Sequence, residues 1–210
     1  MYIPEIKYSG DTSKFVEAEG WEEDTLMLYK DKEYFDNLTQ YVKFVKDCES
    51  AVRTSPDYKI FISFIKRVLG INFCQVSSSI YDTDATVEMH HGPIFTLFDY
   101  ASIMVNHFLN TNKKIDTPRI ADALLDEHFD LHIQVVMLAT TNHEAAHNRD
   151  LFLNVKQGIG DLNRFIELYN KAFDDVHKFK VWNYINMCKN NPSFDTGYLD
   201  IPYIEKVIKI

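Results

Sequence analysis

The sequence predicts a single α+β domain that is mainly helical. Segments with apolar residues at helical spacing lie towards both ends of the 210-residue chain, and short runs of β-forming residues lie between them. Hydrophobic residues make up 46% of the chain, which also has only 7 Gly and 6 Pro, so it can bury a substantial core and has no linker-like stretch. We divide the chain into a mainly helical region 1–80, a central region 81–150, and a C-terminal helical region with a tail, 151–210.

Two helices are expected in the first region. Residues 33–54 place apolar side chains at roughly helical spacing. A second helix over 57–69 follows Pro56 and would end at Gly70, a residue that often terminates helices.

The central region changes to a pattern typical of strands. The segment 71–78, INFCQVSS, is short, apolar and rich in β-formers, and the segment 85–91, ATVEMHH, alternates at period two. We expect these two segments to pair across a polar turn. A third segment, IQVVML at 133–138, is expected to be a buried strand because of its length and β-branching.

Two helices are expected between these strands. Residues 94–108 place apolar residues at i, i+3, i+4 and i+7, which predicts an amphipathic helix. A helix over 118–128 is expected to follow, with Thr117 as its N-cap and Pro118 in its first turn.

Three further elements complete the chain. A helix is expected to start near Asn142, because Thr141 and Glu144 have the spacing of a capping box. Asp161 is expected to cap another helix. The tail, 193–210, is expected to form a loop with a short strand or docking segment.

Four of the eight histidines fall in two short stretches, VEMHHGP from Val87 and TTNHEAAHN from Thr140. The second contains HEAAH at 143–147, which has the H-E-x-x-H pattern of zinc proteases, with Glu167 at a plausible distance for a third ligand. This alternative stays open, but it leaves His90 and His91 without a role.

Taken together, the two stretches read E-x-H-H followed by H-x3-H. This combination resembles the His-Me finger nucleases, also called HNH or ββα-metal nucleases, and especially the colicin DNase variety. The wider chain is also similar to HNH-like proteins encoded by tailed phages. The resemblance implies a ββα-metal core, here with a helical insertion between His91 and His143, embedded in the mainly helical domain.

The resemblance also implies a role for each residue of the motif. His90, His143 and His147 would bind a divalent metal ion, Zn²⁺ or Mg²⁺, and His91 would be the general base, with Glu88 orienting the catalytic groups. Adjacent side chains of a strand point to opposite sides, so His90 can face the metal while His91 faces the scissile phosphate.

The remaining polar candidates are less distinctive. The central Asn of the nuclease motif has no clear equivalent in this chain, where Asn106, Asn110 and Asn142 are the candidates. The other histidines are expected to have structural or surface roles: His107, His128, His132 and His177.

The function expected from these observations is a metal-dependent endonuclease that hydrolyses DNA phosphodiester bonds. The alternatives are the zinc metalloprotease and a non-catalytic phage protein stapled by a metal. The formal net charge of −9 argues against a protein that coats duplex DNA, because phosphate binding depends largely on Lys and Arg.

Three features of the sequence indicate where the protein is located. The three cysteines form no CxxC pair, the N-terminus lacks a signal-peptide pattern, and the apolar stretches are too short to span a bilayer. We therefore expect no membrane association and a cytoplasmic location, which is the host cytoplasm if a phage encodes the chain.

Overall fold

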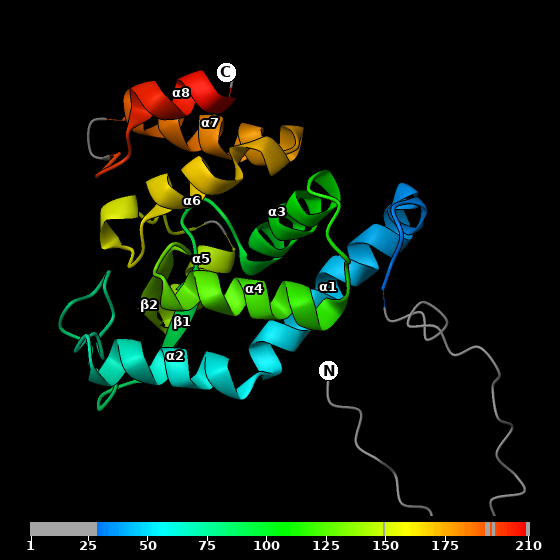
Figure 1. Ribbon diagram of the computed structural model, residues 1–210. Coiled ribbons are helices and arrows are strands. Elements are labelled where there is room, and N and C mark those ends of the chain that lie inside the picture. Colours follow the sequence, from blue (N-terminus) through cyan, green and yellow to red (C-terminus); the bar gives the residue numbers. More distant parts are fainter. Residues whose placement is uncertain (1–28, 149, 192–193, 195, 209–210) are drawn as a thin grey trace, which may run out of the picture.

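A computed structural model describes residues 29–148, 150–191, 194 and 196–208. The N-terminal residues to which the expectation about a signal peptide refers lie outside this range. Figure 1 shows α6, α7 and α8 gathered at one end of the molecule, and it shows α5 and the two strands lying between these helices and α2. The described elements are η2 (Glu33–Asp36), α1 (Leu38–Thr54), α2 (Pro56–Arg67), β1 (Val87–His91), α3 (Leu97–Asn110), α4 (Thr117–Phe129), β2 (Val135–Ala139), α5 (Thr140–His147), η3 (Val155–Gln157), α6 (Leu162–Tyr169), η4 (Asn170–Ala172), α7 (Asp175–Asn190) and α8 (Ile201–Ile208).

The architecture is α+β, as expected, with many helices around one small sheet. One large cluster of buried hydrophobic side chains draws on elements from Phe44 in α1 to Ile208 in α8. The described residues contain no helix that is both long and apolar enough to cross a membrane.

The first two expected helices are present, but α1 begins at Leu38, after η2, and α2 ends at Arg67, before Gly70. The Asn37 side chain caps α1 by accepting hydrogen bonds from the backbone N–H groups of Thr39 and Gln40. Ser55 caps α2, which carries Pro56 in its first turn, where a missing N–H costs nothing.

The sheet pairs β1 with β2, and the expected pairing of 71–78 with 85–91 is wrong. The two strands run antiparallel, with Val87 opposite Ala139 and His91 opposite Val135. Among the described residues, segment 71–78 contributes one isolated bridge, from Phe73 to Tyr81. Its β-forming composition did not suffice, because a strand also needs a partner edge along its length.

Segment 71–78 nevertheless contacts the sheet. The backbone N–H of Gln75 donates to the Met137 carbonyl, and the Gln75 side-chain oxygen accepts from the Met137 N–H. The segment therefore satisfies backbone groups of β2 on the edge that β1 leaves free.

Helices α3 and α4 form the expected insertion between the strands. α3 begins at Leu97 rather than at Ile94, because Thr96 and Asp99 make a reciprocal capping box there. The N-cap of α4 is Asp116, which accepts a hydrogen bond from the Arg119 N–H, so the expectation that Thr117 caps this helix is wrong.

The expected capping box at Thr141 and Glu144 is also wrong. β2 runs directly into α5, whose N-cap position is Ala139 with no side-chain cap. Thr141 is therefore already within the helix, where its hydroxyl cannot take the N-cap position.

The C-terminal region agrees with the sequence in part. Asp161 caps α6 through the Arg164 N–H, as expected. The helix α7 was not expected from the sequence. The tail forms the helix α8, which packs on the core as a docking segment, instead of a short strand. An ion pair of 2.6 Å between Lys189 and Glu205 links α7 to α8, which lie side by side in Figure 1.

Candidate metal centre

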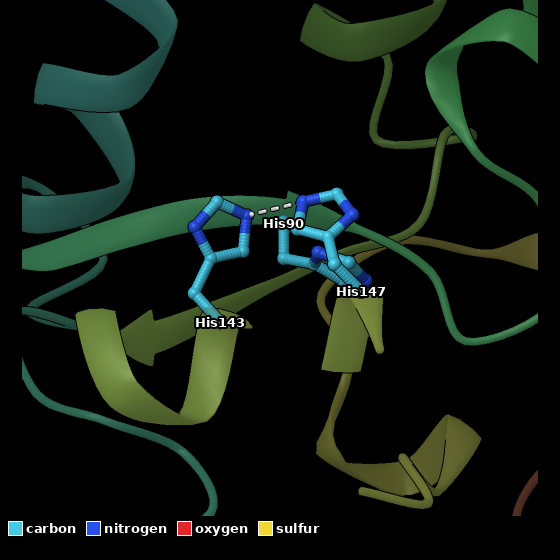
Figure 2. Close-up of side chains that lie close together, drawn as sticks. All are labelled: His90, His143 and His147. Carbon is cyan, nitrogen blue, oxygen red and sulfur yellow. Dashed lines mark hydrogen bonds between the residues drawn. The ribbon is translucent and has the colours of Figure 1, made fainter. Parts of the chain in front are cut away.

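Three histidine side chains converge where β1 passes α5. His90 lies on β1, and His143 and His147 lie one turn apart on α5, so their rings share one face of the helix. One ring nitrogen from each residue can be chosen so that all three lie within 4.8 Å of one another. Figure 2 shows the rings of His143 and His147 facing each other, with the His90 side chain beside them.

Glu88 fixes the orientation of one of these rings. Glu88 lies two positions before His90, on the same face of β1. Its Oε2 accepts a hydrogen bond of 2.6 Å from Nδ1 of His143. The proton on Nδ1 leaves Nε2 of a neutral His143 with a lone pair directed at Nε2 of His147, 3.1 Å away. The two nitrogens must share either a proton or a cation.

The environment of His90 favours the neutral ring. Burial, and the positive charge that His143 and His147 can carry, lower the pKa of the half-buried His90 to about 4. At neutral pH this imidazole therefore keeps the lone pair that a metal ligand needs.

Gly92 leaves room for the His90 ring. A Cβ at residue 92 would lie 3.1 Å from Cδ2 and 3.2 Å from Nε2 of His90. The position of this ring thus depends on the absence of a side chain two residues later in the chain.

His91 lies on the other side of β1, in the core. Its side chain is buried, only 5% of the residue is exposed, and Nε2 lies 2.9 Å from Nε2 of His128. The ring stacks at 6.1 Å on Tyr58 and contacts Tyr100. The alternation expected for adjacent strand residues is present, but the face opposite the three-histidine site is packed with side chains, so the geometry does not support a role for His91 at a scissile phosphate.

Polar contacts hold the start of α5 against the loop that precedes β1. The Asn142 amide donates to Cys74 Sγ and to Ser77 Oγ, each at 3.1 Å. Burial acts to raise the pKa of the Cys74 thiol, but hydrogen bonds from backbone groups and from Asn142 outweigh burial and lower the pKa. These contacts hold the helix that carries two of the three histidines.

The other two candidates for the missing Asn lie elsewhere. Asn106 contacts Tyr41 and the Ala172 carbonyl, and Asn110 donates to the Lys171 carbonyl. Of the three, Asn142 alone is a neighbour of the histidine site, on the same helix.

The structure gives Glu167 a partner outside the histidine site. Its carboxylate pairs with Arg164 in the adjacent turn of α6. The third nitrogen near the HEAAH pair comes instead from His90, which precedes the motif. Glu144 lies on α5 between His143 and His147 and is exposed to solvent.

A pocket of about 430 Å³ adjoins the three-histidine site. His90 and His147 form part of its wall, together with the segment between β1 and α3, the segment after α5, and α7. The remaining lining residues are mostly apolar: His91, Pro93, Ile94, Phe95, Thr96, Ala146, Leu151, Phe152, Leu153, Lys180, Asn183, Tyr184 and Met187. The part contributed by α7 was not predicted from the sequence, because its residues are far from the motif in the chain.

A second set of polar side chains, Ser102, His177 and Asp174, has the residue types of a hydrolase triad, but its serine is closed to substrate. Nε2 of His177 lies 2.7 Å from Ser102 Oγ, and its Nδ1 lies 2.7 Å from Asp174. Ser102 and His177 are both buried, with 3% and 2% of each residue exposed. A substrate cannot reach this serine, so the cluster cross-links α3 to the start of α7.

Residues 3–210 match the family described as Bacteriophage G278-like virion protein. The chain belongs to this family. No curated protein and no solved structure matches the chain.

This membership confirms the expectation that the chain is a phage protein. The family is described by its place in the virion, and this description names no activity. The functional proposal therefore rests on the three-histidine site. Residence in the host cytoplasm stays a prediction.

Proposed function

We propose that this virion protein binds a divalent metal ion through His90, His143 and His147 and uses it to hydrolyse phosphodiester bonds of DNA. The observation that carries the proposal is the convergence of three imidazole nitrogens within 4.8 Å. Three histidines are a common ligand set of catalytic zinc, which keeps one coordination position open for water or substrate. Mg²⁺ favours oxygen ligands, so zinc or another transition metal suits this set better.

Glu88 supports the proposal as a neighbour of the ligands. A histidine that binds a metal usually donates its other N–H to a carboxylate or carbonyl, which fixes the tautomer. The 2.6 Å contact from His143 Nδ1 to Glu88 has this geometry. A bound ion would supply positive charge for the phosphate and a water of lowered pKa.

The order of the elements adds support for a nuclease over other metal-dependent hydrolases. Two antiparallel strands are followed by a short helix, with one ligand on the first strand and two on the helix. This is the order expected from the resemblance to the His-Me finger nucleases. The proposal departs from that resemblance at one residue, because the buried His91 is not assigned the role of general base.

Metal content tests the first half of the proposal. Purified protein stripped with chelator is dialysed against Zn²⁺, Ni²⁺ or Mn²⁺, and bound metal is measured by mass spectrometry. We expect one ion per chain in the wild type and in the control His107→Ala, whose ring lies on α3 and packs against Tyr169. His147→Ala should lose most of this binding, and equal binding by His147→Ala would contradict the site.

Cleavage tests the second half. Supercoiled plasmid and single-stranded circular DNA are incubated with the protein and each metal, and then with excess chelator. We expect cleavage in at least one metal that stops with chelator and is lost in His147→Ala. Metal binding without cleavage of either DNA would favour a metal-stapled, non-catalytic virion protein.

The zinc metalloprotease remains as a second candidate because of one observation. His143 and His147 are aligned on α5 with Glu144 between them, as in H-E-x-x-H proteases. Its third ligand would have to be His90, because Glu167 pairs with Arg164. Replacing Glu144 separates the two candidates, as set out below.

A further inference from the structure

The pocket beside the three histidines has the form of a ligand site. Its volume of about 430 Å³ is in the range of small-molecule pockets, and apolar walls with a few polar groups are typical of them. The walls include Ile94, Leu151 and Met187, with the Asn183 amide as a polar group. Because His90 and His147 also line it, a ligand in the pocket would lie next to a metal bound by these histidines.

The charge of the pocket does not suit a segment of duplex. Lys180 is the single Lys or Arg among the described lining residues. Its Nζ lies 2.7 Å from both carboxylate oxygens of the buried Asp99, so its charge is already balanced. A duplex is held mainly by several Lys or Arg contacts to phosphates, which this pocket does not offer.

We propose that the pocket holds one unpaired nucleobase next to the phosphodiester bond that is cleaved, so that the substrate is single-stranded or locally unpaired DNA. This inference rests on the proposed function and specifies its substrate class. A base paired within a duplex cannot enter a pocket, whereas an unpaired base can be buried and can bond to an amide through its Watson–Crick edge. Asn183 offers such an amide, and the apolar walls replace the stacking that the base loses.

Filling the pocket tests this inference without changing a metal ligand. Met187 and Val176 both lie on α7 and are 39% and 59% exposed, but of the two only Met187 lines the pocket. Met187→Trp places a large ring in the pocket, and Val176→Trp is the matched control on the same helix. Both variants are first checked for an unchanged melting temperature and for zinc binding equal to that of the wild type.

Binding is measured with thymidine 5′-monophosphate on the zinc-loaded protein, by saturation-transfer NMR of the base protons. We expect saturation of these protons in the wild type and in Val176→Trp, and an affinity reduced roughly tenfold or more in Met187→Trp, the effect of losing one base contact. Equal affinity in all three proteins would overturn the inference.

Cleavage of matched substrates separates this inference from the proposed function. We expect single-stranded DNA to be cut at least about tenfold faster than the duplex of the same sequence, and Met187→Trp to lose this cleavage. Equal rates on the two substrates would overturn the unpaired-base inference and leave the proposed function intact. No cleavage of either substrate with any metal would overturn the proposed function, while the NMR titration still reports on the pocket.

Discussion

His91 and His128 face each other in the core, with their Nε2 atoms 2.9 Å apart. Nδ1 of His128 lies 2.6 Å from the Leu124 carbonyl, so this nitrogen carries the proton and donates it. Nε2 of a neutral His128 must then accept, and Nε2–H of His91 donates to it. Burial lowers the pKa of both rings, so both are neutral at pH 7 and each has a defined tautomer.

This pair makes stability sensitive to acid. Burial lowers the pKa of His128 to about 4, against the hydrogen bond to Leu124, which acts to raise it. The unfolded histidine, with a pKa near ~6.5, binds protons more readily, so the stabilising contribution is present above pH 6.5 and is lost as the pH falls towards 4. We expect a loss of about 2 kcal/mol between pH 7 and pH 5 from this group.

The measurement is urea unfolding of metal-free wild type and His128→Gln at several pH values in this window. His128→Gln is expected to be less stable at pH 7 but to lose about 2 kcal/mol less than the wild type on going to pH 5. Parallel curves for the two proteins would show that His128 is not the titrating group.

Glu88→Ala is expected to weaken metal binding without removing a ligand. His143 would lose the acceptor that holds its Nδ1 proton, and loss of such a partner typically costs ~10–100-fold in metal affinity. Competition with a chromophoric zinc chelator measures this change, and Glu144→Ala is the control on the neighbouring helix. If both variants bind zinc as tightly as the wild type, the carboxylate does not orient His143.

Gly92→Ala is expected to displace the His90 ring. The added Cβ would lie 3.1 Å from Cδ2 of His90, closer than ordinary van der Waals contact, so the ring must move. We expect zinc affinity to fall while the midpoint of urea unfolding of the metal-free protein changes little. Unchanged zinc affinity would mean that the ring can bind the ion from a second position.

Glu144→Gln separates the two enzymatic candidates. In the nuclease proposal this exposed residue has no catalytic role, so DNA cleavage and metal content should stay at the wild-type level. In a zinc metalloprotease this Glu is the general base, whose loss typically costs ~10²–10⁴ in rate. Assays of casein and plasmid cleavage on the same preparations decide between them, and a loss of plasmid cleavage would count against our proposal.

His91→Phe tests whether the buried ring takes part in chemistry. A phenyl ring keeps the aromatic packing against Tyr58 but removes the hydrogen bond to His128, which leaves a buried acceptor unpaired at a cost of about 1–3 kcal/mol. We expect lower stability, unchanged zinc affinity, and DNA cleavage retained below the melting temperature. Folded, zinc-loaded protein that no longer cuts would restore the general-base role implied by the resemblance.

The elements that the sequence predicted well are those whose signal is local. Apolar spacing located the helices α1 and α2, and the cap Asp161 located α6, because a cap acts within one turn of its own chain. The pairing of 71–78 with 85–91 was predicted wrongly, since adjacency in sequence does not reveal which edge a strand will find. The helix α7 was not singled out because it is apolar on its exposed as well as its buried side, at Phe179 and Val181 for example.

The sequence by itself determined the set of metal-ligand candidates. Two histidines at i and i+4 share a helix face, and the resemblance of the combined motif to the His-Me finger nucleases adds a histidine on a strand, so His90, His143 and His147 could be named from the sequence.

Only the tertiary structure decided what lies on each side of that strand. His90 and His91 are adjacent and chemically identical, yet one meets His143 and His147 on α5 and the other meets His128 in the core. Strand geometry requires the two side chains to diverge, but the destination of each depends on α4 and α7, which are brought there by the packing of side chains distant in sequence.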